Sequence, residues 1–463
     1  PMITGNMMTA LGAVAAGCKF YAAYPMSPAT SILHWMAGHT EQVGVVVKQA
    51  EDEIAAINLA IGAGHAGVRA LTATSGGGFA LMTEAIGMAG MIETPVVVVN
   101  VMRGGPSTGL PTKTEQGDLN QAIGASQGDF PRVIVAPKDA ADCFSTMVES
   151  FNLAEKWQLP VIVLSDLYLG EHRSTLDPDR VSHDVPIDRG EWADEDDAAT
   201  NHAGGFLRYR ITDSGVSPRA RAGQKGLQHT SATDEHDERG ILVSDEHTNA
   251  AIRRKMIEKR MRKMDGVLAS LPAPAIEGPA DAEATLIGWG SMWGVINEAA
   301  ERLRASGIPV NQLHFKWLWP FHENEARALL EACNRTVVIE ANFSGQFARH
   351  LRAETGFTVD EVLLKYDGEP IEPQWVVGEV KRVLQGADKS LDVDETEVRE
   401  MAYHFIRIHL KDQVRPVRYE HVARNGSEAV WNVDLVDRKE ATPRGRLVIG
   451  HESGKLHAWE PTA

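Results

Sequence analysis

The chain has 463 residues, an apolar content of 43% and a net charge of −17, which predict a globular protein of two or three domains. Its acidity argues against nucleic-acid binding, which needs a basic face, and no apolar run is long enough to span a bilayer. Three widely spaced cysteines (Cys18, Cys143 and Cys333) provide no zinc or iron–sulfur ligand set, so we expect no metal site on this chain and any redox centre on another chain. The low cysteine content fits a reducing compartment, so we expect a cytoplasmic protein.

The first part of the chain alternates apolar strands with alanine- and glycine-rich helices. Strands are predicted at 19–23, 43–47, 70–74, 96–101, 132–135 and 161–164, and helices at 5–17, 30–38, 52–67 and 79–91. Strands that alternate with helices of about a dozen residues are typical of an α/β fold with a doubly wound parallel sheet. We assign residues 1–175 to this first domain.

Residues 176–280 have a different character and are predicted to be a charged connector. They contain many Asp, His, Arg and Ser residues and few apolar repeats, and they end in a helix at 249–264. The run 234–238, which includes His236, is interpreted as a solvated loop.

Two regions follow the connector. Residues 281–385 are predicted to form a second, smaller α/β domain, with strands at 285–287, 310–315 and 336–340. Residues 386–463 begin as an acidic extension of unknown role, and the rest of this stretch is predicted to be irregular apart from a final strand at 446–449.

The strand at 96–101 is followed by Arg103 and a long loop rich in glycine and proline. A loop at the carboxyl end of a parallel strand lies where open α/β sheets bind ligands. The planar guanidinium of Arg103 is suited to a carboxylate. The alternative is a surface loop that carries a solvated arginine.

Three strand ends upstream carry further candidate groups. Ser27 lies between two prolines and could bind an oxyanion, or the segment is a simple proline turn. Glu51 either decorates a helix start or turns inward to hold a ring nitrogen. The segment Thr74-Ser75-Gly76-Gly77-Gly78 allows an anion to approach backbone N–H groups, or it is tight strand–helix packing.

These loops occur in a characteristic order: Tyr24-Pro25-Met26-Ser27-Pro28, Gln49-Ala50-Glu51, Thr74-Ser75-Gly76-Gly77-Gly78 and Arg103-Gly104-Gly105-Pro106-Ser107. Together they resemble the alpha subunit of 2-oxoacid:ferredoxin oxidoreductases, particularly the two-subunit type that acts on 2-oxoglutarate or pyruvate. The resemblance covers residues 3–385 and includes the segment 339–346.

The resemblance implies a fold and an activity. Residues 1–175 resemble the pyrimidine-binding domain of thiamine-diphosphate enzymes, and residues 281–385 resemble the transketolase C-terminal domain. The implied reaction is the oxidative decarboxylation of a 2-oxoacid with coenzyme A to acyl-CoA, CO₂ and reduced ferredoxin. The implied partner is a beta subunit that carries Mg²⁺ and a [4Fe–4S] cluster, so that the active site lies between two chains. Whether a gamma-type domain that contributes to coenzyme A binding is a separate chain stays open.

The resemblance also implies roles for single residues. Glu51 matches the glutamate that hydrogen-bonds the aminopyrimidine of thiamine diphosphate, and Arg103 matches the arginine that pairs with the 2-oxoacid carboxylate. Ser27 stands where the family usually has Thr, and it keeps the hydroxyl for substrate binding. The remaining residues expected to line the cofactor are Pro25, Thr74, Ser75 and Gly76.

Two alternatives are kept. One is the pyrimidine-domain subunit of another thiamine-diphosphate enzyme, either an NAD-linked 2-oxoacid dehydrogenase or a transketolase-like protein. The other is a non-catalytic phosphate-binding protein that uses the glycine loops. The loop after Arg103 favours a 2-oxoacid:ferredoxin oxidoreductase over both alternatives.

Overall fold

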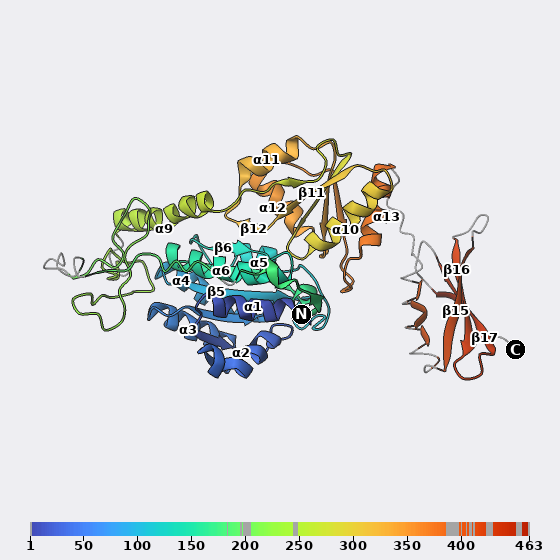
Figure 1. Ribbon diagram of the computed structural model, residues 1–463, viewed down its shortest axis with the longest axis horizontal. Helices are drawn as coiled ribbons and strands as arrows, with labels where there is room; N and C mark the ends of the chain where they lie inside the picture. Colours follow the sequence, from blue (N-terminus) through green and yellow to red (C-terminus); the bar gives the residue numbers. More distant parts are fainter. Residues whose placement is uncertain are drawn as a thin grey trace. The chain divides into compact units, whose positions relative to one another are not determined.

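A seven-stranded sheet forms the centre of the first part of the chain in the computed structural model (Figure 1). Its strand order is β12-β6-β7-β5-β4-β2-β3, and all neighbours are parallel except β12 and β6. The strands are β2 (Phe20–Ala23), β3 (Val46–Gln49), β4 (Ala70–Thr74), β5 (Val96–Met102), β6 (Val133–Val135), β7 (Pro160–Asp166) and β12 (Trp317–Trp319).

Helices cover both faces of this sheet, as the prediction of a doubly wound fold requires. The helices are α1 (Gly5–Ala15), α2 (Thr30–Val43), α3 (Glu53–His65), α4 (Gly76–Met91), α5 (Leu119–Ile123), α6 (Ala140–Trp157) and α7 (Leu167–Glu171). Alternate residues of β5 pack on opposite sides: Val96 and Val98 join α3 and α4, whereas Val97 and Val99 join α1, α2 and α6. The α/β class and the parallel sheet are therefore confirmed.

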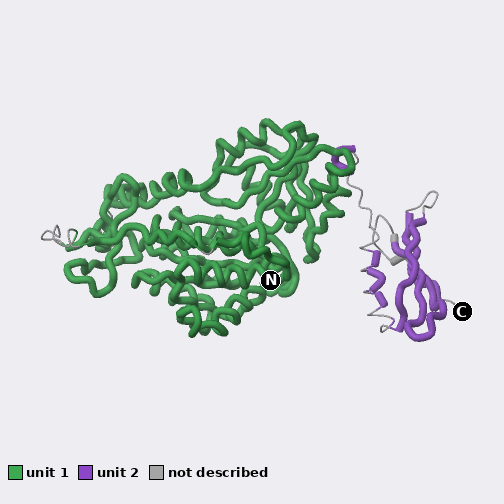
Figure 2. Tube along the Cα trace, viewed as in Figure 1, with its two compact units in different colours: residues 1–380 green, residues 381–463 purple. Residues whose placement is uncertain are grey.

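The chain divides into two compact units, Pro1–Val380 and Lys381–Ala463 (Figure 2). The structure describes residues 2–385 apart from 183, 195–196, 198–204 and 244–248, and beyond them the ranges 398–399, 401–403, 405–406, 410, 413–422, 429–450 and 456–461. Within these described residues no helix combines the length and the apolar character needed to cross a membrane.

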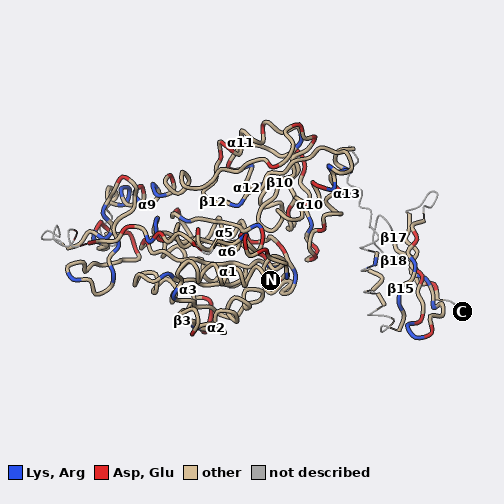
Figure 3. The backbone as a smooth tube through the Cα atoms, in the orientation of Figure 1, with Lys and Arg blue, Asp and Glu red and all other residues tan. Residues whose placement is uncertain are grey.

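The connector contains little regular structure, but it is packed. Just before it, β8 (Ser174–Thr175) pairs with β1 (Met2–Ile3), and its described residues include a 3₁₀ helix at Pro178–Arg180 and α9 (Ala250–Ser270). Lys and Arg are frequent along α9 and the loops before it (Figure 3). His236, predicted to be solvated, is fully buried, and its ring lies 4.3 Å from that of the buried Tyr209. The sequence did not predict this burial, because the connector packs through ion pairs and single aromatic rings and has no apolar repeat.

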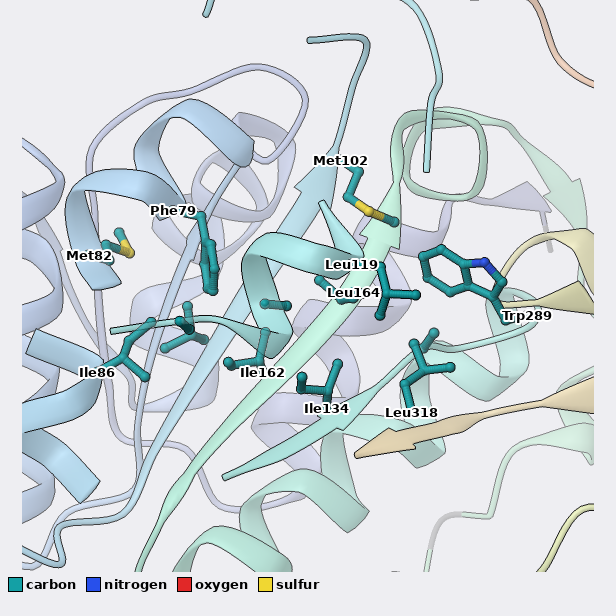
Figure 4. Close-up of a cluster of buried hydrophobic side chains, with 14 of the residues drawn as sticks. Phe79, Met82, Ile86, Met102, Leu119, Ile134, Ile162, Leu164, Trp289 and Leu318 are labelled. Atoms are coloured by element: carbon teal, nitrogen blue, oxygen red, sulfur yellow. The ribbon is translucent and has the colours of Figure 1, made fainter. Parts of the chain in front are cut away.

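A second sheet has the strand order β14-β13-β10-β11-β9. Its elements are β9 (Ile276–Glu277), β10 (Ala284–Trp289), α10 (Met292–Ala305), β11 (Val310–Phe315), α11 (Glu323–Glu331), β13 (Thr336–Glu340), α12 (Gln346–Thr355), β14 (Glu361–Leu364) and α13 (Pro373–Leu384). Trp289 and Leu318 from this part share a core with Met102 and Leu164 of the first sheet (Figure 4). Strand β12 follows β11 in the chain but pairs with β6 of the seven-stranded sheet. The sequence analysis did not predict this pairing.

Two strand predictions are corrected by the structure. The strand expected at 43–47 begins at Val46, because α2 continues to Val43 and Gly44, at φ +62°, ends the helix in the left-handed conformation. The C-terminal stretch, which was predicted to be irregular apart from a strand at 446–449, instead contains an antiparallel four-stranded sheet. Its strands are β15 (Val414–Val422), β16 (Val430–Asp437), β17 (Pro443–Gly450) and β18 (Leu456–Pro461). The acidic segment at 386–397 lies outside the described residues.

We expect His314 on β11 to make folding of the second sheet sensitive to pH. Burial lowers the pKa of His314 to about 3, and within the described residues neither ring nitrogen has a hydrogen-bond partner. Below pH ~6.5 the unfolded chain takes up a proton that the folded chain refuses, so stability is complete above that pH and falls toward pH 3. We expect up to about 1.4 kcal/mol of lost stability per pH unit from this residue.

Urea unfolding of the wild type and of His314→Gln at pH 7.5 and pH 5.5 checks this expectation. The wild type should lose more stability between the two pH values than the variant does, even if the variant is less stable at both. Equal losses in the two proteins would show that His314 does not titrate in this way.

Candidate active site

The candidate loops leave one edge of the seven-stranded sheet side by side. Strands β5, β4, β2 and β3 are consecutive neighbours and run parallel, so their carboxyl ends lie along the same edge. The residues that follow these ends are Arg103, Ser75, Ser27 and Glu51. The structure therefore brings the sequence-predicted residues to one crevice edge, which is where open α/β sheets bind ligands.

Arg103 joins two of these loops. Its Nη1 donates a 2.7 Å hydrogen bond to the carbonyl oxygen of Ser27. The Arg103 side chain is half-buried and Ser27 is exposed. No other hydrogen bond of the Arg103 side chain is made within the described residues, so the guanidinium keeps further N–H donors for an anion. Thr74 approaches the same loop, with its hydroxyl 3.9 Å from the sulfur of Met26.

Three neighbouring acids at the start of α3 have three different environments. Asp52 caps the helix and accepts a 2.7 Å hydrogen bond from the backbone N–H of Ala55. Glu53 is 3% exposed, and its Oε1 has no hydrogen-bond partner in the described part of the chain. Glu51 is exposed, and among the described residues nothing hydrogen-bonds or pairs with its carboxylate. Glu51 is therefore the acid that this chain leaves available to a group from outside.

The backbone at the start of α4 packs closely against neighbouring side chains. Ser75 is fully buried at the N-cap position, makes no side-chain capping bond, and its hydroxyl has no partner within the described residues. A Cβ on Gly78 would lie 2.1 Å from the Thr74 hydroxyl and 2.6 Å from Glu53 Oε1, so only glycine fits there. The N-terminus of α4 also carries the positive end of the helix dipole.

Asp118 and Asn100 belong to this edge, and the sequence analysis did not select them. Asn100 Nδ2 donates a 3.0 Å hydrogen bond to Asp118, and the Asp118 carboxylate lies against Gly76, where a Cβ would come within 2.5 Å. Burial raises the pKa of Asp118, while the Asn100 hydrogen bond and the charge of Arg103 oppose the shift. The sequence signal that could have pointed to these residues is the asparagine inside the otherwise apolar run of β5.

Residues around the second sheet support the loop that follows Arg103. Gln116 donates from Nε2 to the carbonyl oxygen of Trp289 at 3.0 Å, and its own carbonyl oxygen accepts from Asn342 at 3.1 Å. Glu340 is fully buried, and its carboxylate accepts hydrogen bonds from Asn342 and from the backbone at the start of α12. The segment 339–346 that contributed to the resemblance thus holds the Arg103 loop in position.

A metal site is not formed by this chain in its described part, where no group of three or more His, Cys, Asp or Glu side chains could hold an ion. The three cysteines are free, and Cys18 and Cys143 are buried. What the edge offers is an arginine, hydroxyl groups, an exposed carboxylate and a glycine-rich helix start.

The fold defines a class: an open α/β sheet with this strand-end crevice, joined to a smaller α/β domain. Residues 11–256 match the family described as "Pyruvate flavodoxin/ferredoxin oxidoreductase, thiamine diP-bdg", and residues 282–376 match "Pyruvate:ferredoxin oxidoreductase core domain II". The class is therefore that of a thiamine-diphosphate-binding region followed by core domain II of the pyruvate:ferredoxin oxidoreductases.

Relatives narrow the class further. The chain is 35% identical over 412 residues to 2-oxoacid:ferredoxin oxidoreductase 2, subunit alpha, of Aeropyrum pernix, which covers 84% of this chain and 62% of the relative. It is 35% identical over 383 residues to 2-oxoglutarate synthase subunit KorA of Methanothermobacter thermautotrophicus, which covers 82% of this chain and 98% of the relative. The chain belongs to the 2-oxoacid:ferredoxin oxidoreductase family and resembles its alpha subunits.

A solved structure agrees with this assignment. The chain matches the 2-oxoglutarate:ferredoxin oxidoreductase from Magnetococcus marinus, solved with 2-oxoglutarate, coenzyme A and succinyl-CoA bound, with a TM-score of 0.75 and 39% identity. The match covers 83% of this chain and 65% of that chain. This sequence therefore spans less than two thirds of the length of that protein and of the Aeropyrum relative.

Proposed function

We propose that this chain is the alpha subunit of a 2-oxoacid:ferredoxin oxidoreductase that converts a 2-oxoacid and coenzyme A to acyl-CoA, CO₂ and reduced ferredoxin. The observation that carries the proposal is the contact of Arg103 with the Ser27 loop, beside the start of α4 and at the same sheet edge as Glu51. Because 2-oxoglutarate is bound in the Magnetococcus structure, we propose 2-oxoglutarate as the first substrate to test and pyruvate as the second.

The proposed cofactor is thiamine diphosphate, which supplies stabilisation of the carbanion left by decarboxylation. The residues of this chain suit it, because the Ser75 hydroxyl is buried without a partner and the Glu51 carboxylate is free to accept a hydrogen bond. Pro25, Thr74 and Gly76 would complete the wall. Mg²⁺ and a [4Fe–4S] cluster are proposed for a beta subunit, which the resemblance implies, and the described residues of this chain offer no group of three or more ligands for either.

Each proposed role follows from the chemistry of the side chain. Arg103 binds the carboxylate of the 2-oxoacid with N–H groups that stay free after its bond to Ser27. The exposed Ser27 hydroxyl donates a further hydrogen bond to the same substrate. Glu51 holds a proton between its carboxylate and a ring nitrogen, which sets the tautomer of the bound cofactor.

We propose the domain division 1–175, 176–280 and 281–385 for the catalytic part of the chain, with 386–463 as an added unit. Ferredoxin as the electron acceptor, a cytoplasmic location and a separate gamma-type domain belong to the same proposal. The alternatives of an NAD-linked dehydrogenase, a transketolase-like protein or a phosphate-binding protein have less support, because the relatives are named 2-oxoacid:ferredoxin oxidoreductases.

The test is co-expression of the full chain with the neighbouring reading frames, followed by assay of methyl viologen reduction with coenzyme A and a panel of 2-oxoacids. We expect reduction that needs a 2-oxoacid, coenzyme A and thiamine diphosphate together. A complex that holds its cluster and its cofactor but reduces no acceptor with any 2-oxoacid would overturn the proposal. Omission of each component in turn is the control.

A further inference from the structure

The loop that carries Ser27 is held by a hydrogen bond at each of three successive carbonyl oxygens. That of Met26 accepts from the first backbone N–H of α2 at 3.1 Å. That of Ser27 accepts from Arg103 Nη1 at 2.7 Å. That of Pro28 accepts from Asn6 Nδ2 at 3.0 Å. The backbone of the loop is therefore fixed from three directions, and two of the three donors are side chains from other parts of the chain.

Asn6 reaches this loop from a buried position at the start of α1. It is the second residue of that helix and is 1% exposed. The helix start is itself fixed by Thr4, whose hydroxyl accepts a 3.2 Å hydrogen bond from the backbone N–H of Met7. Because Asn6 is buried, any effect that it has on a bound substrate must pass through the residues it contacts.

The orientation of the Asn6 amide follows from its neighbours. Nδ2 lies 3.0 Å from the carbonyl oxygen of Pro28 and 3.1 Å from Glu171 Oε1, and a carbonyl or an ionised carboxylate can only accept. Nδ2 also lies 2.8 Å from the hydroxyl of Ser31, which donates its own proton to Glu171 at 2.7 Å. The NH₂ group of Asn6 must therefore face these three acceptors, since its side-chain oxygen could satisfy none of them.

Two glycines allow close packing around the Asn6 amide. A Cβ on Gly170 in α7 would lie 2.9 Å from Asn6 Oδ1 and 3.0 Å from Asn6 Nδ2. A Cβ on Gly5 would lie 2.4 Å from the carbonyl oxygen of Leu169. Helices α1 and α7 are therefore in close contact and hold the amide in place, and an interior packed in this way transmits small displacements.

We propose that Asn6 is a positioning residue for the 2-oxoacid, which acts through the carbonyl oxygen of Pro28 on the Ser27 loop and hence on Arg103. The carbonyl oxygens that accept from Arg103 and from Asn6 belong to consecutive residues, so a shift of the loop moves the Ser27 hydroxyl and the guanidinium together. The remaining N–H groups of Arg103 would then miss the substrate carboxylate. This inference rests on the proposed function, because it assigns Asn6 to the binding of the 2-oxoacid.

The test is Asn6→Asp in the co-expressed complex, assayed by reduction of methyl viologen. The variant keeps the size of the side chain but replaces the N–H donor with an acceptor that the Pro28 carbonyl oxygen repels. We expect kcat/KM for the 2-oxoacid to fall by up to about 10²-fold, the cost of a displacement of about 1 Å. The fall should come mainly from a higher KM for the 2-oxoacid, with the KM for coenzyme A unchanged. An unchanged KM for the 2-oxoacid would overturn the proposal.

Asn152→Asp is the matched control. Asn152 in α6 also donates from Nδ2 to a proline carbonyl oxygen, that of Pro186 in the connector, at 2.8 Å. Tm should fall in both variants, because each leaves a carbonyl oxygen without its donor. The KM for the 2-oxoacid should rise only in Asn6→Asp. Equal increases in the two variants would show a general loss of packing and would count against a positioning role.

A double-mutant cycle separates positioning from a structural effect. Because Asn6 is proposed to act through Arg103, Asn6→Asp should cost much less in kcat/KM when Arg103→Ala is already present. Equal costs in the two backgrounds would overturn the proposal. If Asn6→Asp does not fold, Asn6→Ala takes its place in the cycle, with Asn152→Ala as its control, because it removes the donor without burying a charge.

The wild type separates this inference from the proposed function. Absence of any reduction that depends on a 2-oxoacid in the wild type would overturn the proposed function. Normal turnover of the wild type, together with an unchanged KM in the Asn6 variants, would overturn only the role of Asn6.

Discussion

Glu51→Gln is expected to lower kcat of the assembled enzyme by about 10²–10⁴-fold, the usual contribution of a positioned general acid–base group. The amide keeps the size of the side chain but cannot take up or release the proton that the cofactor ring shares with the carboxylate. The KM for the 2-oxoacid should change little, since Glu51 is not expected to touch the substrate. Steady-state reduction of methyl viologen with saturating coenzyme A measures both quantities.

Variants of two other acids, Glu41 and Glu53, serve as controls for this prediction. Glu41→Gln removes an exposed carboxylate from α2 and is the matched control, for which we expect unchanged kcat. Glu53→Gln alters the buried acid against Thr74 and Gly78, so it should change stability more than kcat. If Glu53→Gln abolished turnover while Glu51→Gln kept it, the catalytic assignment would move to Glu53.

Arg103→Ala should lower kcat/KM for the 2-oxoacid by about 10²-fold or more, because truncating one partner of a charged hydrogen-bonded pair costs about 2–5 kcal/mol. The loss should appear mainly as a higher KM for the 2-oxoacid, with the KM for coenzyme A unchanged. Binding of thiamine diphosphate should persist, since Arg103 is proposed to contact the substrate. Initial rates over a range of 2-oxoacid concentrations give the two constants separately.

Two further variants test why an arginine is needed at this position. Arg103→Lys keeps the charge but loses the planar fork that grips a carboxylate at two points, so it should recover only part of the loss. Arg254→Ala removes an exposed arginine from α9 and should behave like the wild type. Unchanged kcat/KM in Arg103→Ala would remove this residue from the substrate site.

Much of this architecture follows from local sequence patterns. The run at β5 is apolar and rich in β-branched residues, and the strands predicted at β4, β5 and β11 coincide with the observed ones to within a residue. Glycine and proline residues follow β4 and β5 and end both strands. The sequence therefore placed the loops that carry Ser75 and Arg103 at the carboxyl ends of these strands. Local signals suffice for β5, because a parallel strand buried on both faces is nearly all apolar, with Asn100 as the exception here.

Other features depend on partners distant in the chain, and no local pattern reports them. Strand β12 pairs with β6 although about 180 residues separate them, a register that only tertiary packing sets. His236 is buried against Tyr209, and the neighbouring Glu235 pairs with Arg260 of α9. The three acids 51–53 look alike in the sequence, yet one is exposed, one caps α3 and one is buried.

The sequence by itself determined the α/β class, the order of the strands along the chain and the loops that carry candidate chemistry, since these depend on hydrophobic period and on glycine and proline. Only the tertiary structure decided which strands are neighbours, which acid stays free, and how residues around the second sheet support the Arg103 loop. Burial and charge balance are properties of groups brought together from distant segments, so they arise when the chain folds and not before.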